Sequence, residues 1–344
     1  MKKIILTLTT CLLLLAGLTH AQVTYKIANT FHIDGNEGWD YITADDTLPR
    51  LFVSHGSMVQ VVDMSNGKIL GTINDLHGVH GITLAHDLNK GFISSGKDST
   101  VVVFELMNYT TLAKIKVTGA NPDAIIYDRV THRVFAFNGR SMSATVIDAN
   151  TNKVIATIGL EGKPEFAVVD DLGKLYVNIE SKSTYCVINT STMKVENTYS
   201  IAPGEEPSGL AIDKKNHRLF MACDNKMMVV ADYQTGKVVT TIPIGEGPDA
   251  VAFDAGLNRI YSSNGDGTLT VVQQISADKF EVLATVPTQK GARTEAVYQR
   301  NHHIYLPAAE YNPKPEASKD NPKPRATIKQ GSFVILDIAP SDGK

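Results

Sequence analysis

The stretch RLFVSHG at residues 50–56 is the strongest indication of the fold, because variants of it recur along the whole chain. Every copy has an aromatic residue at its third position and aliphatic or small neighbours, a short apolar run typical of a buried strand. The seven copies are RLFVSHG (50–56), KGFISSG (90–96), RVFAFNG (133–139), KLYVNIE (174–180), RLFMACD (218–224), RIYSSNG (259–265) and HIYLPAA (303–309). No eighth copy occurs.

A second strand-like element precedes each copy. The elements are WDYITAD (39–45), HGITLA (80–85), DAIIYD (123–128), EFAVVD (165–170), SGLAID (208–213), DAVAFD (249–254) and TEAVYQ (294–299). Successive elements start about 40–45 residues apart, which is the length of one propeller blade. Each repeat supplies two more apolar strands, such as TLTVVQ (268–273) and EVLATVP (281–287). The sequence therefore predicts an all-β, seven-bladed β-propeller with four antiparallel strands per blade.

The turns and the chain ends agree with this fold. Gly67 and Gly236 follow Asn66 and Thr235 between Val- and Ile-rich runs, where a short hairpin needs a positive φ. The run VTYKIANTFHI (23–33) has no blade of its own, and GSFVILDI (331–338) ends the last repeat. We expect the N-terminal strand to close the last blade as its outermost strand, which hides both ends from edge pairing.

The first 21 residues have the features of a secretory signal peptide. Lys2 and Lys3 precede an apolar run, and a small-x-Ala sequence ends at Ala21. Cys11 lies inside that run rather than at its end, which disfavours a lipid anchor. We therefore expect a periplasmic or secreted protein whose single domain spans 22–344, with no membrane span.

Charge and cysteine content narrow the partners. Without Lys2 and Lys3, 31 basic residues face 36 acidic ones, with no long run of one sign, so nucleic acid is a poor candidate. Cys186 and Cys223 either form one bridge or remain buried thiols. Their strand-like contexts favour buried thiols. We expect a monomer whose partner is a small polar ligand or another protein.

The repeated strand, which appears as KLYVN and RLFVS, resembles the secreted YVTN-repeat β-propellers of bacteria. The resemblance covers residues 23–338 approximately, and copies such as KGFIS and HIYLP depart from the pattern. It implies the fold, because the motif recurs in register seven times. It implies no particular function, because a fold hosts many functions.

Propeller topology brings two sets of loops around one mouth: those entering each inner strand and those joining the two middle strands. We expect that mouth to be polar and of mixed charge. The candidate ligand-binding residues are Trp39, Asp123, Asn138, Arg140, Glu165, Glu180, Asp249, Arg293, Glu295 and Glu310. Copies that depart from the consensus, as at His80, Ser208 and Thr294, carry more functional weight, because a ligand needs an asymmetric site.

Histidines and carboxylates of the first two blades are the sharpest chemical candidates. His55, His77 and His80 are expected to approach Asp40 and Glu37 across neighbouring loops. Imidazole with carboxylate can hold a divalent metal or act as an acid–base pair, so His55, His80, Asp40 and Glu37 are the catalytic candidates. His55, His80 and Asp40 are also the metal candidates. Against this, the chain has no HxH or HExxH spacing.

Other mouth residues have two interpretations. Arg140, Arg293, Glu295 and Glu310 can clamp a carboxylate or phosphate, or form an ion-pair ring that braces the loops. Trp39, the one tryptophan, either packs in a blade or offers a platform for a sugar or an aromatic ligand.

The three carboxylates that follow a proline have a structural interpretation, in which they accept hydrogen bonds from turn amides. They occur at Pro122-Asp123, Pro164-Glu165 and Pro248-Asp249.

The last blade contains a Pro-rich insertion at 307–330, which excludes a helix or a strand there. Three interpretations remain open for it: a lid over the central funnel, an extended segment that binds a partner, and a surface loop without function.

Two classes of function follow from these residues. The first is a binding protein or interaction scaffold that uses the polar mouth of the funnel. The alternative is a metal- or acid/base-dependent hydrolase or lyase, lactonase-like, at the same mouth. The cofactor is left open, with a divalent metal as the candidate. A serine hydrolase lacks its GxSxG motif, phosphate and dinucleotide loops are absent, and one tryptophan disfavours a quinone-dependent dehydrogenase.

Overall fold

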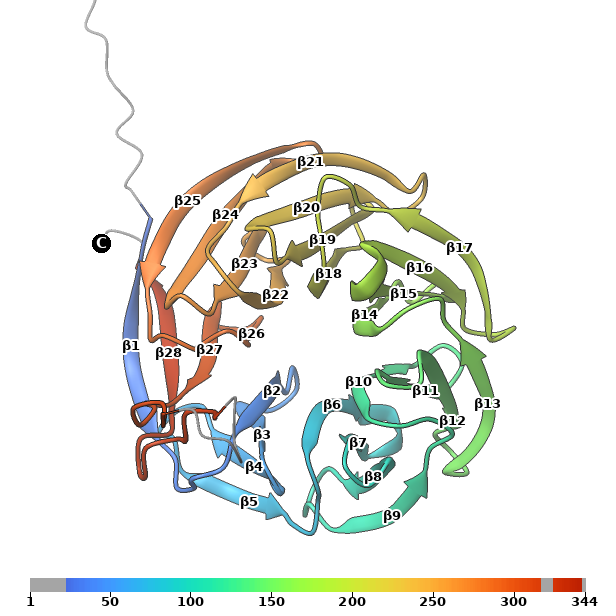
Figure 1. Ribbon diagram of the computed structural model, residues 1–344, viewed down its shortest axis with the longest axis horizontal. Helices are drawn as coiled ribbons and strands as arrows, with labels where there is room; N and C mark the ends of the chain where they lie inside the picture. The colour runs from blue at the N-terminus through green and yellow to red at the C-terminus, as the bar shows by residue number, and fades with distance from the viewer. Residues whose placement is uncertain (1–22, 317–323, 342–344) are drawn as a thin grey trace, which may run out of the picture.

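The computed structural model describes residues 23–316 and 324–341, which form seven four-stranded antiparallel sheets. The predicted signal peptide and residues 317–323 of the predicted insertion lie outside the described residues. Figure 1 shows the sheets arranged as a closed ring around a central axis. The seven-bladed propeller predicted from the repeats is confirmed.

In each blade the four strands are ordered from the axis to the rim. Blade 1 has β2 (Trp39–Ala44), β3 (Arg50–His55), β4 (Met58–Asp63) and β5 (Ile69–Ile73). Blade 2 has β6 (Val79–Ala85), β7 (Lys90–Ser95), β8 (Thr100–Glu105) and β9 (Thr111–Lys116). Blade 3 has β10 (Pro122–Asp128), β11 (Arg133–Asn138), β12 (Ser143–Asp148) and β13 (Lys153–Gly159). Blade 4 has β14 (Pro164–Val169), β15 (Lys174–Ile179), β16 (Thr184–Asn189) and β17 (Lys194–Ser200).

The remaining blades follow the same order. Blade 5 has β18 (Pro207–Asp213), β19 (Arg218–Cys223), β20 (Met227–Asp232) and β21 (Lys237–Pro243). Blade 6 has β22 (Pro248–Asp254), β23 (Arg259–Asn264), β24 (Thr268–Ser276) and β25 (Lys279–Pro287). Blade 7 has β26 (Ala296–Tyr298), β27 (His303–Ala308), β28 (Val334–Ser341) and β1 (Thr24–His32). Two single-turn 3-10 helices, η1 (His86–Leu88) and η2 (Glu180–Lys182), follow inner or second strands.

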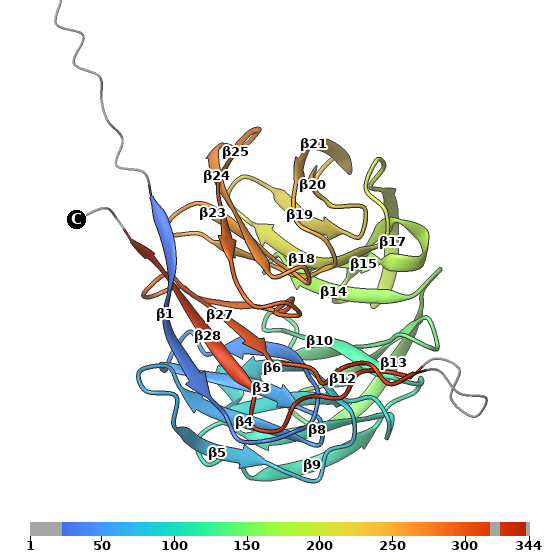
Figure 2. The same ribbon diagram turned by 60° about the vertical axis from the view of Figure 1, so that its left-hand side comes forward.

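The ring is closed by pairing the two ends of the chain. β1 pairs antiparallel with β28 from Thr24 opposite Ser341 to His32 opposite Val334, and the two strands run side by side in Figure 2. β1 is the outermost strand of the last blade, as predicted.

The hydrophobic core is divided among the seven interfaces between neighbouring blades. The second strands are buried on both faces, which is why they read as continuous apolar runs rather than alternating ones. At the interface of blades 1 and 2, Phe52 and Phe104 are fully buried, with ring centroids 5.7 Å apart. Burying each such ring stabilises the fold by about 1.5–3 kcal/mol.

The hairpin turns adopt the backbone conformation that the sequence predicts. Gly67 and Gly236 have φ of 72° and 75°. A Cβ on Gly67 would lie 2.6 Å from the ring of Phe31 in β1, so this glycine also lets the closing strand approach blade 1.

Blade 7 differs from the sequence prediction in two places. Its inner strand is only three residues long, because Arg293 bends away and its carbonyl accepts from Ala250 and Ser263 of blade 6. Pro307, expected in the insertion, lies within β27. The pairing of β27 with β26 ends at Tyr305, so the missing N–H of Pro307 removes no bond of that ladder.

Cys186 and Cys223 are both free thiols in buried positions, as favoured from their contexts, and burial raises the pKa of each to about 12.

Within 23–316 and 324–341, no helix is long and apolar enough to cross a membrane.

Candidate functional site

One strand position, repeated in all blades, forms a ring at the mouth of the central channel. It is the second residue of six inner strands and the equivalent residue of blade 7. A register shift directly follows the first residue of these six strands, and such bulges redirect side chains out of the ladder. The ring residues are Asp40, His80, Asp123, Glu165, Ser208, Asp249 and Thr294.

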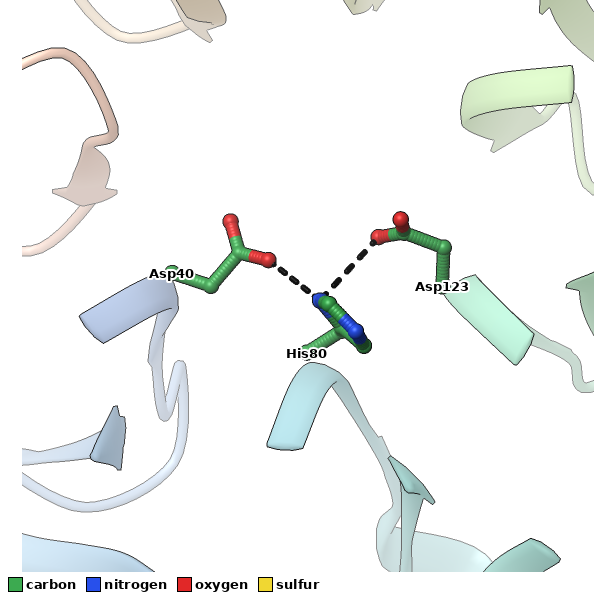
Figure 3. A group of neighbouring side chains, drawn as sticks. All are labelled: Asp40, His80 and Asp123. Carbon is green, nitrogen blue, oxygen red and sulfur yellow. Dashed lines mark hydrogen bonds and ion pairs between the residues drawn. The ribbon is translucent and has the colours of Figure 1, made fainter. Parts of the chain in front are cut away.

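Three consecutive members of this ring converge on one point. The Nδ1 atom of His80 lies 2.6 Å from Oδ2 of Asp40 and 3.7 Å from Oδ1 of Asp123. Figure 3 shows the imidazole between the two carboxylates, each carried by a different inner strand. One potential ligand atom from each side chain lies within 4.8 Å of the other two, a spacing that suits a shared metal ion. All three side chains remain about a quarter exposed or less, at 24%, 26% and 19% for His80, Asp40 and Asp123.

Crowding of negative charge shifts the pKa values of the ring. Burial, with Asp40 and Asp249 nearby, raises the pKa of Asp123 to about 6. Burial and Asp123 raise the pKa of Glu165 to about 8. Burial disfavours the charged imidazole of His80, but the hydrogen bond to Asp40 and the neighbouring carboxylates outweigh it and raise its pKa. The ring thus has more carboxyl groups than its surroundings can keep ionised.

The rest of the ring makes polar contacts within blade 4 and between blades 5, 6 and 7. Lys163 Nζ lies 2.5 Å from Glu165 and 2.6 Å from Glu180. Ser208 donates to the Oδ1 atom of Asp249 at 2.7 Å, and the Nε atom of Arg293 lies 3.1 Å from Oδ2 of the same residue. The carboxylates that follow a proline therefore contact His80, Lys163, Ser208 and Arg293. The turn-amide interpretation of these carboxylates was wrong.

An aromatic pair crosses the channel next to the ring. The rings of Tyr41 in β2 and Phe166 in β14 stack with centroids 4.5 Å apart, although their blades are not neighbours. The hydroxyl of Tyr41 is buried and has no hydrogen-bond partner among the described residues. Burial and then the ring carboxylates raise its pKa well above the ordinary value. A polar atom without a protein partner therefore lies close to the acidic ring.

His55 and Glu37 are placed away from this group. The Nδ1 atom of His55 lies 2.7 Å from Oε1 of Gln60, and its Nε2 atom lies 3.0 Å from the backbone oxygen of Glu37. The ring of His55 is buried and packs on Phe333, with centroids 4.2 Å apart. The Glu37 side chain accepts from the backbone of Ser57. The structure therefore brings together His80 and Asp40, adds Asp123, and leaves His55 and Glu37 in contacts within blade 1.

The expected cluster of Arg140, Arg293, Glu295 and Glu310 is not formed. Arg140 is exposed, Arg293 contacts Asp249, and Glu310 pairs with Lys329 at 2.6 Å. Glu295 is buried, its carboxyl oxygens have no side-chain partner in the described part of the chain, and burial raises its pKa well above normal. Arg140 belongs to blade 3, whereas Arg293, Glu295 and Glu310 belong to blade 7.

Asn138, another ligand-binding candidate, is fully buried and donates to Ser143 and Thr145 of its own blade. Asn264 makes the same contacts with Thr268 and Thr270 in blade 6. The repetition of this network in two blades indicates a structural role for Asn138.

A pocket of about 440 Å³ opens beside Asp40 at the mouth. It is lined by Trp39, Asp40, Gly247, Gly265, Gly291, Arg293, Thr294 and Tyr311. Trp39 packs on Phe333 at 5.5 Å, as one of its two interpretations expects, and it also lines this pocket with Tyr311 of the insertion. The described part of the insertion lies beside blade 1, away from the central axis in Figure 1, and its Tyr311 lines this pocket.

The larger cavity lies at the opposite end of the channel, at the other ends of the inner strands. It measures about 680 Å³ and is lined by Asp46, Leu84, His86, Asp87, Tyr127, Arg129, Val130 and Asp171. Asp171 lies 2.6 Å from Lys214 and 3.3 Å from Arg129. Burial alone would raise the pKa of Asp171, but these two cations outweigh it and lower the pKa. We place the candidate site at the mouth because three side chains of metal-ligating type, Asp40, His80 and Asp123, converge there.

Comparison with known proteins adds the fold and nothing more specific. No family model matches the chain, and no curated protein matches it. A chain of Kuenenia stuttgartiensis hydrazine synthase has a similar structure, with a TM-score of 0.68 and 15% sequence identity over 87% of this chain and 97% of that chain. At this identity the similarity supports the propeller fold alone.

Tyr41, Phe166 and Tyr311 were not predicted from the sequence as site residues. The sequence does contain a signal for Tyr41 and Phe166. Gly81, Ala124, Gly209 and Ala250 occupy the equivalent position in four other blades, so large aromatic residues there are exceptional. No comparable signal exists for Tyr311, which lies in the irregular insertion.

Proposed function

We propose that this chain is an exported binding protein that holds a divalent cation, and beside it a small polar ligand, at the mouth of the propeller. The observation that carries the proposal is the convergence of Asp40, His80 and Asp123 from three blades, with their ligand atoms within 4.8 Å of one another. Export rests on the signal-peptide features of residues 1–21.

The electrostatics of the ring support a cation. The raised pKa of Asp123 and of Glu165 means that their ionised forms are disfavoured by burial and by each other. A bound cation removes that penalty and stabilises the charged forms. Two carboxylates with one imidazole suit ions such as Mn²⁺ or Zn²⁺, which accept both oxygen and nitrogen ligands.

Binding must compete with protons. The Nδ1 atom that faces both carboxylates is the atom that hydrogen-bonds to Asp40, so an ion can coordinate it only after the imidazole loses its proton there. We therefore expect cation affinity to increase as the pH rises through the pKa values of His80 and Asp123.

Calorimetric titration of the chelator-treated full chain with MnCl₂ and with ZnCl₂ tests the proposal. We expect one site per chain, lost in His80→Gln and unchanged in His77→Gln. His77 is a suitable control because it is exposed on the same face and its nearest carboxylate, Asp98, is 3.9 Å away. Wild-type protein that binds neither ion, or His80→Gln that binds as tightly as wild type, would contradict the proposal.

An acid–base enzyme remains the second candidate function. The observation that favours it is a histidine held against a carboxylate whose pKa is raised to about 6, close to an open pocket. Such a pair can remove and return a proton near neutral pH. A screen of lactones would support this candidate if turnover were found and were lost in both His80→Gln and Asp123→Asn with the fold retained.

A further inference from the structure

The mouth pocket contains the chemical groups that recognise a particular class of small molecule. Its volume of about 440 Å³ falls in the range of ordinary small-molecule sites. It lies directly beside Asp40, a member of the proposed cation site. We infer that this pocket binds a sugar acid, meaning a single pyranose ring that carries a carboxylate. This inference rests on the proposed function and names the class of its ligand.

Arg293 supplies a site for the carboxylate. Its Nε atom lies 3.1 Å from Asp249, which fixes the direction of the side chain, while the side chain as a whole is 59% exposed. Within the described residues, its two terminal amino groups have no partner. A guanidinium oriented in this way can receive a carboxylate through two parallel hydrogen bonds.

Two aromatic rings supply a platform for a sugar ring. Trp39 and Tyr311 come from opposite ends of the chain, and their centroids lie 6.1 Å apart with planes tilted by 40°. Trp39 is fixed from behind by Phe333, and Tyr311 is half exposed at the rim. The apolar faces of a pyranose pack on such rings, while its hydroxyl groups remain available for hydrogen bonds.

Part of the pocket lining is backbone without side chains. Gly265 donates its backbone N–H to Gly247, and Gly291 donates to Gly265, both at 2.9 Å, so three glycines form a continuous backbone surface. A Cβ on Gly265 would lie 3.0 Å from the oxygen of Gly247, and one on Gly291 would lie 3.6 Å from the ring of Tyr311. Glycine at these positions leaves this part of the pocket free of side chains.

The inner end of the pocket offers acceptors for hydroxyl groups. Asp40 uses Oδ2 for His80, and its Oδ1 atom has no partner among the described residues. Thr294 donates its hydroxyl to the backbone oxygen of Asp40 at 2.7 Å, which leaves that hydroxyl able to accept. These polar groups favour a sugar acid over an aromatic acid, because an aromatic ring would leave them without partners.

Titration with D-galacturonate and D-glucuronate, each with MnCl₂ and with EDTA, tests the inference. We expect at least one uronate to bind at least about tenfold more tightly than the matching neutral sugar, and benzoate to bind more weakly than the uronate. Arg293→Lys should remove most of this preference, because lysine lacks the fork, and Tyr311→Ala should weaken uronate binding several-fold. Arg129→Lys, at the opposite end of the channel, is the matched control.

The outcomes separate this inference from the cation site. Arg293→Lys should retain Mn²⁺ binding, because Arg293 is not one of the three converging residues. Uronates that fail to bind while Mn²⁺ binds would overturn the sugar-acid inference and leave the cation proposal intact. Equal affinity for galactose and galacturonate, or tighter binding of benzoate, would also overturn it. Uronate binding in a protein that takes up no cation would overturn only the proposed cation site.

Discussion

The two ends of the central channel are built by the same inner strands, yet the pKa values of their carboxyl groups are shifted differently. At the mouth, burial and mutual repulsion raise the pKa of Asp123 to about 6 and that of Glu165 to about 8. At the other end, Lys214 and Arg129 overcome the effect of burial on Asp171 and lower its pKa. At the mouth the protonated forms of two carboxyl groups are therefore favoured, whereas at the other end two cations keep Asp171 ionised, although burial and Asp45 raise the pKa of Asp46 there.

The difference distinguishes carboxylates that stabilise the scaffold from those of the candidate site. Where blades need only to be held together, an acidic residue is given a cationic or hydrogen-bonding partner, as Asp45 is by Thr47 and Arg50. The mouth ring keeps carboxyl groups that destabilise the protein when ionised. Residues that weaken a fold without a compensating contact are expected at functional sites.

The largest expected effect is on cation affinity, which should depend on carboxylates at the mouth and not on those at the other end. Asp123→Asn removes one of the three converging ligands and should weaken Mn²⁺ binding by about a hundredfold or more, since even outer partners of metal ligands contribute about 10–100-fold. Asp171→Asn makes the same chemical change at the other end and should leave the affinity unchanged. Calorimetry of both variants measures this. Equal affinities in the two variants would remove the distinction between the ends.

The next effect concerns pH. An acid whose pKa is higher in the folded than in the unfolded protein binds its proton more tightly when folded, so its contribution to stability is lost as pH rises toward the folded value. Asp123 and Glu165 are such acids, and His80, whose pKa is also raised, acts in the same direction. The free energy of unfolding of the metal-free protein should therefore fall by several kcal/mol between about pH 4 and pH 8.

Urea unfolding across this pH range checks the slope. Glu165→Gln should flatten it, because glutamine cannot ionise, whereas Asp171→Asn should not, because the lowered pKa of Asp171 affects stability only at lower pH. A slope that is the same in Glu165→Gln and in wild type would show that the mouth ring is not its source.

The smallest expected effect is on the free energy of unfolding when one tyrosine hydroxyl is removed at each end of the channel. Tyr41→Phe removes a buried hydroxyl without a partner and should raise the free energy of unfolding by about 1 kcal/mol while keeping the stacking on Phe166. Tyr127→Phe, at the other end, removes a hydroxyl that donates to Asp87 at 2.9 Å and should lower it by about 1 kcal/mol. Chemical denaturation measures both. A loss of stability in Tyr41→Phe would mean that its hydroxyl has a partner in solution.

The sequence predicted the fold because every blade repeats the same local pattern, so seven copies in register leave one ring architecture. It also predicted that Asp40 and His80 would meet, because equivalent residues of adjacent inner strands lie at the same level. The same argument applies to Asp123, which was predicted to bind a ligand but, because of the proline before it, was also interpreted as a turn carboxylate.

The remaining site could not be predicted, because it depends on loops and on contacts across the axis. His55 is removed from the site by two partners, Gln60 and the backbone of Glu37, whose positions depend on the path of the chain after β1. Tyr41 and Phe166 meet across non-adjacent blades, a contact that no local periodicity encodes. Tyr311 reaches Trp39 from an insertion that has no counterpart in the other repeats.

The antiparallel pairing of β1 with β28 also determines how the ring responds to force. Thr24 faces Ser341 at one end of that ladder, so the two chain ends emerge next to each other. A pull applied between them loads the hydrogen bonds one pair at a time, as in a zipper, instead of all together. A propeller tethered through both ends is therefore expected to open at its seam at low force, whereas a load applied across any other blade meets a sheet whose strands are continuous in the chain.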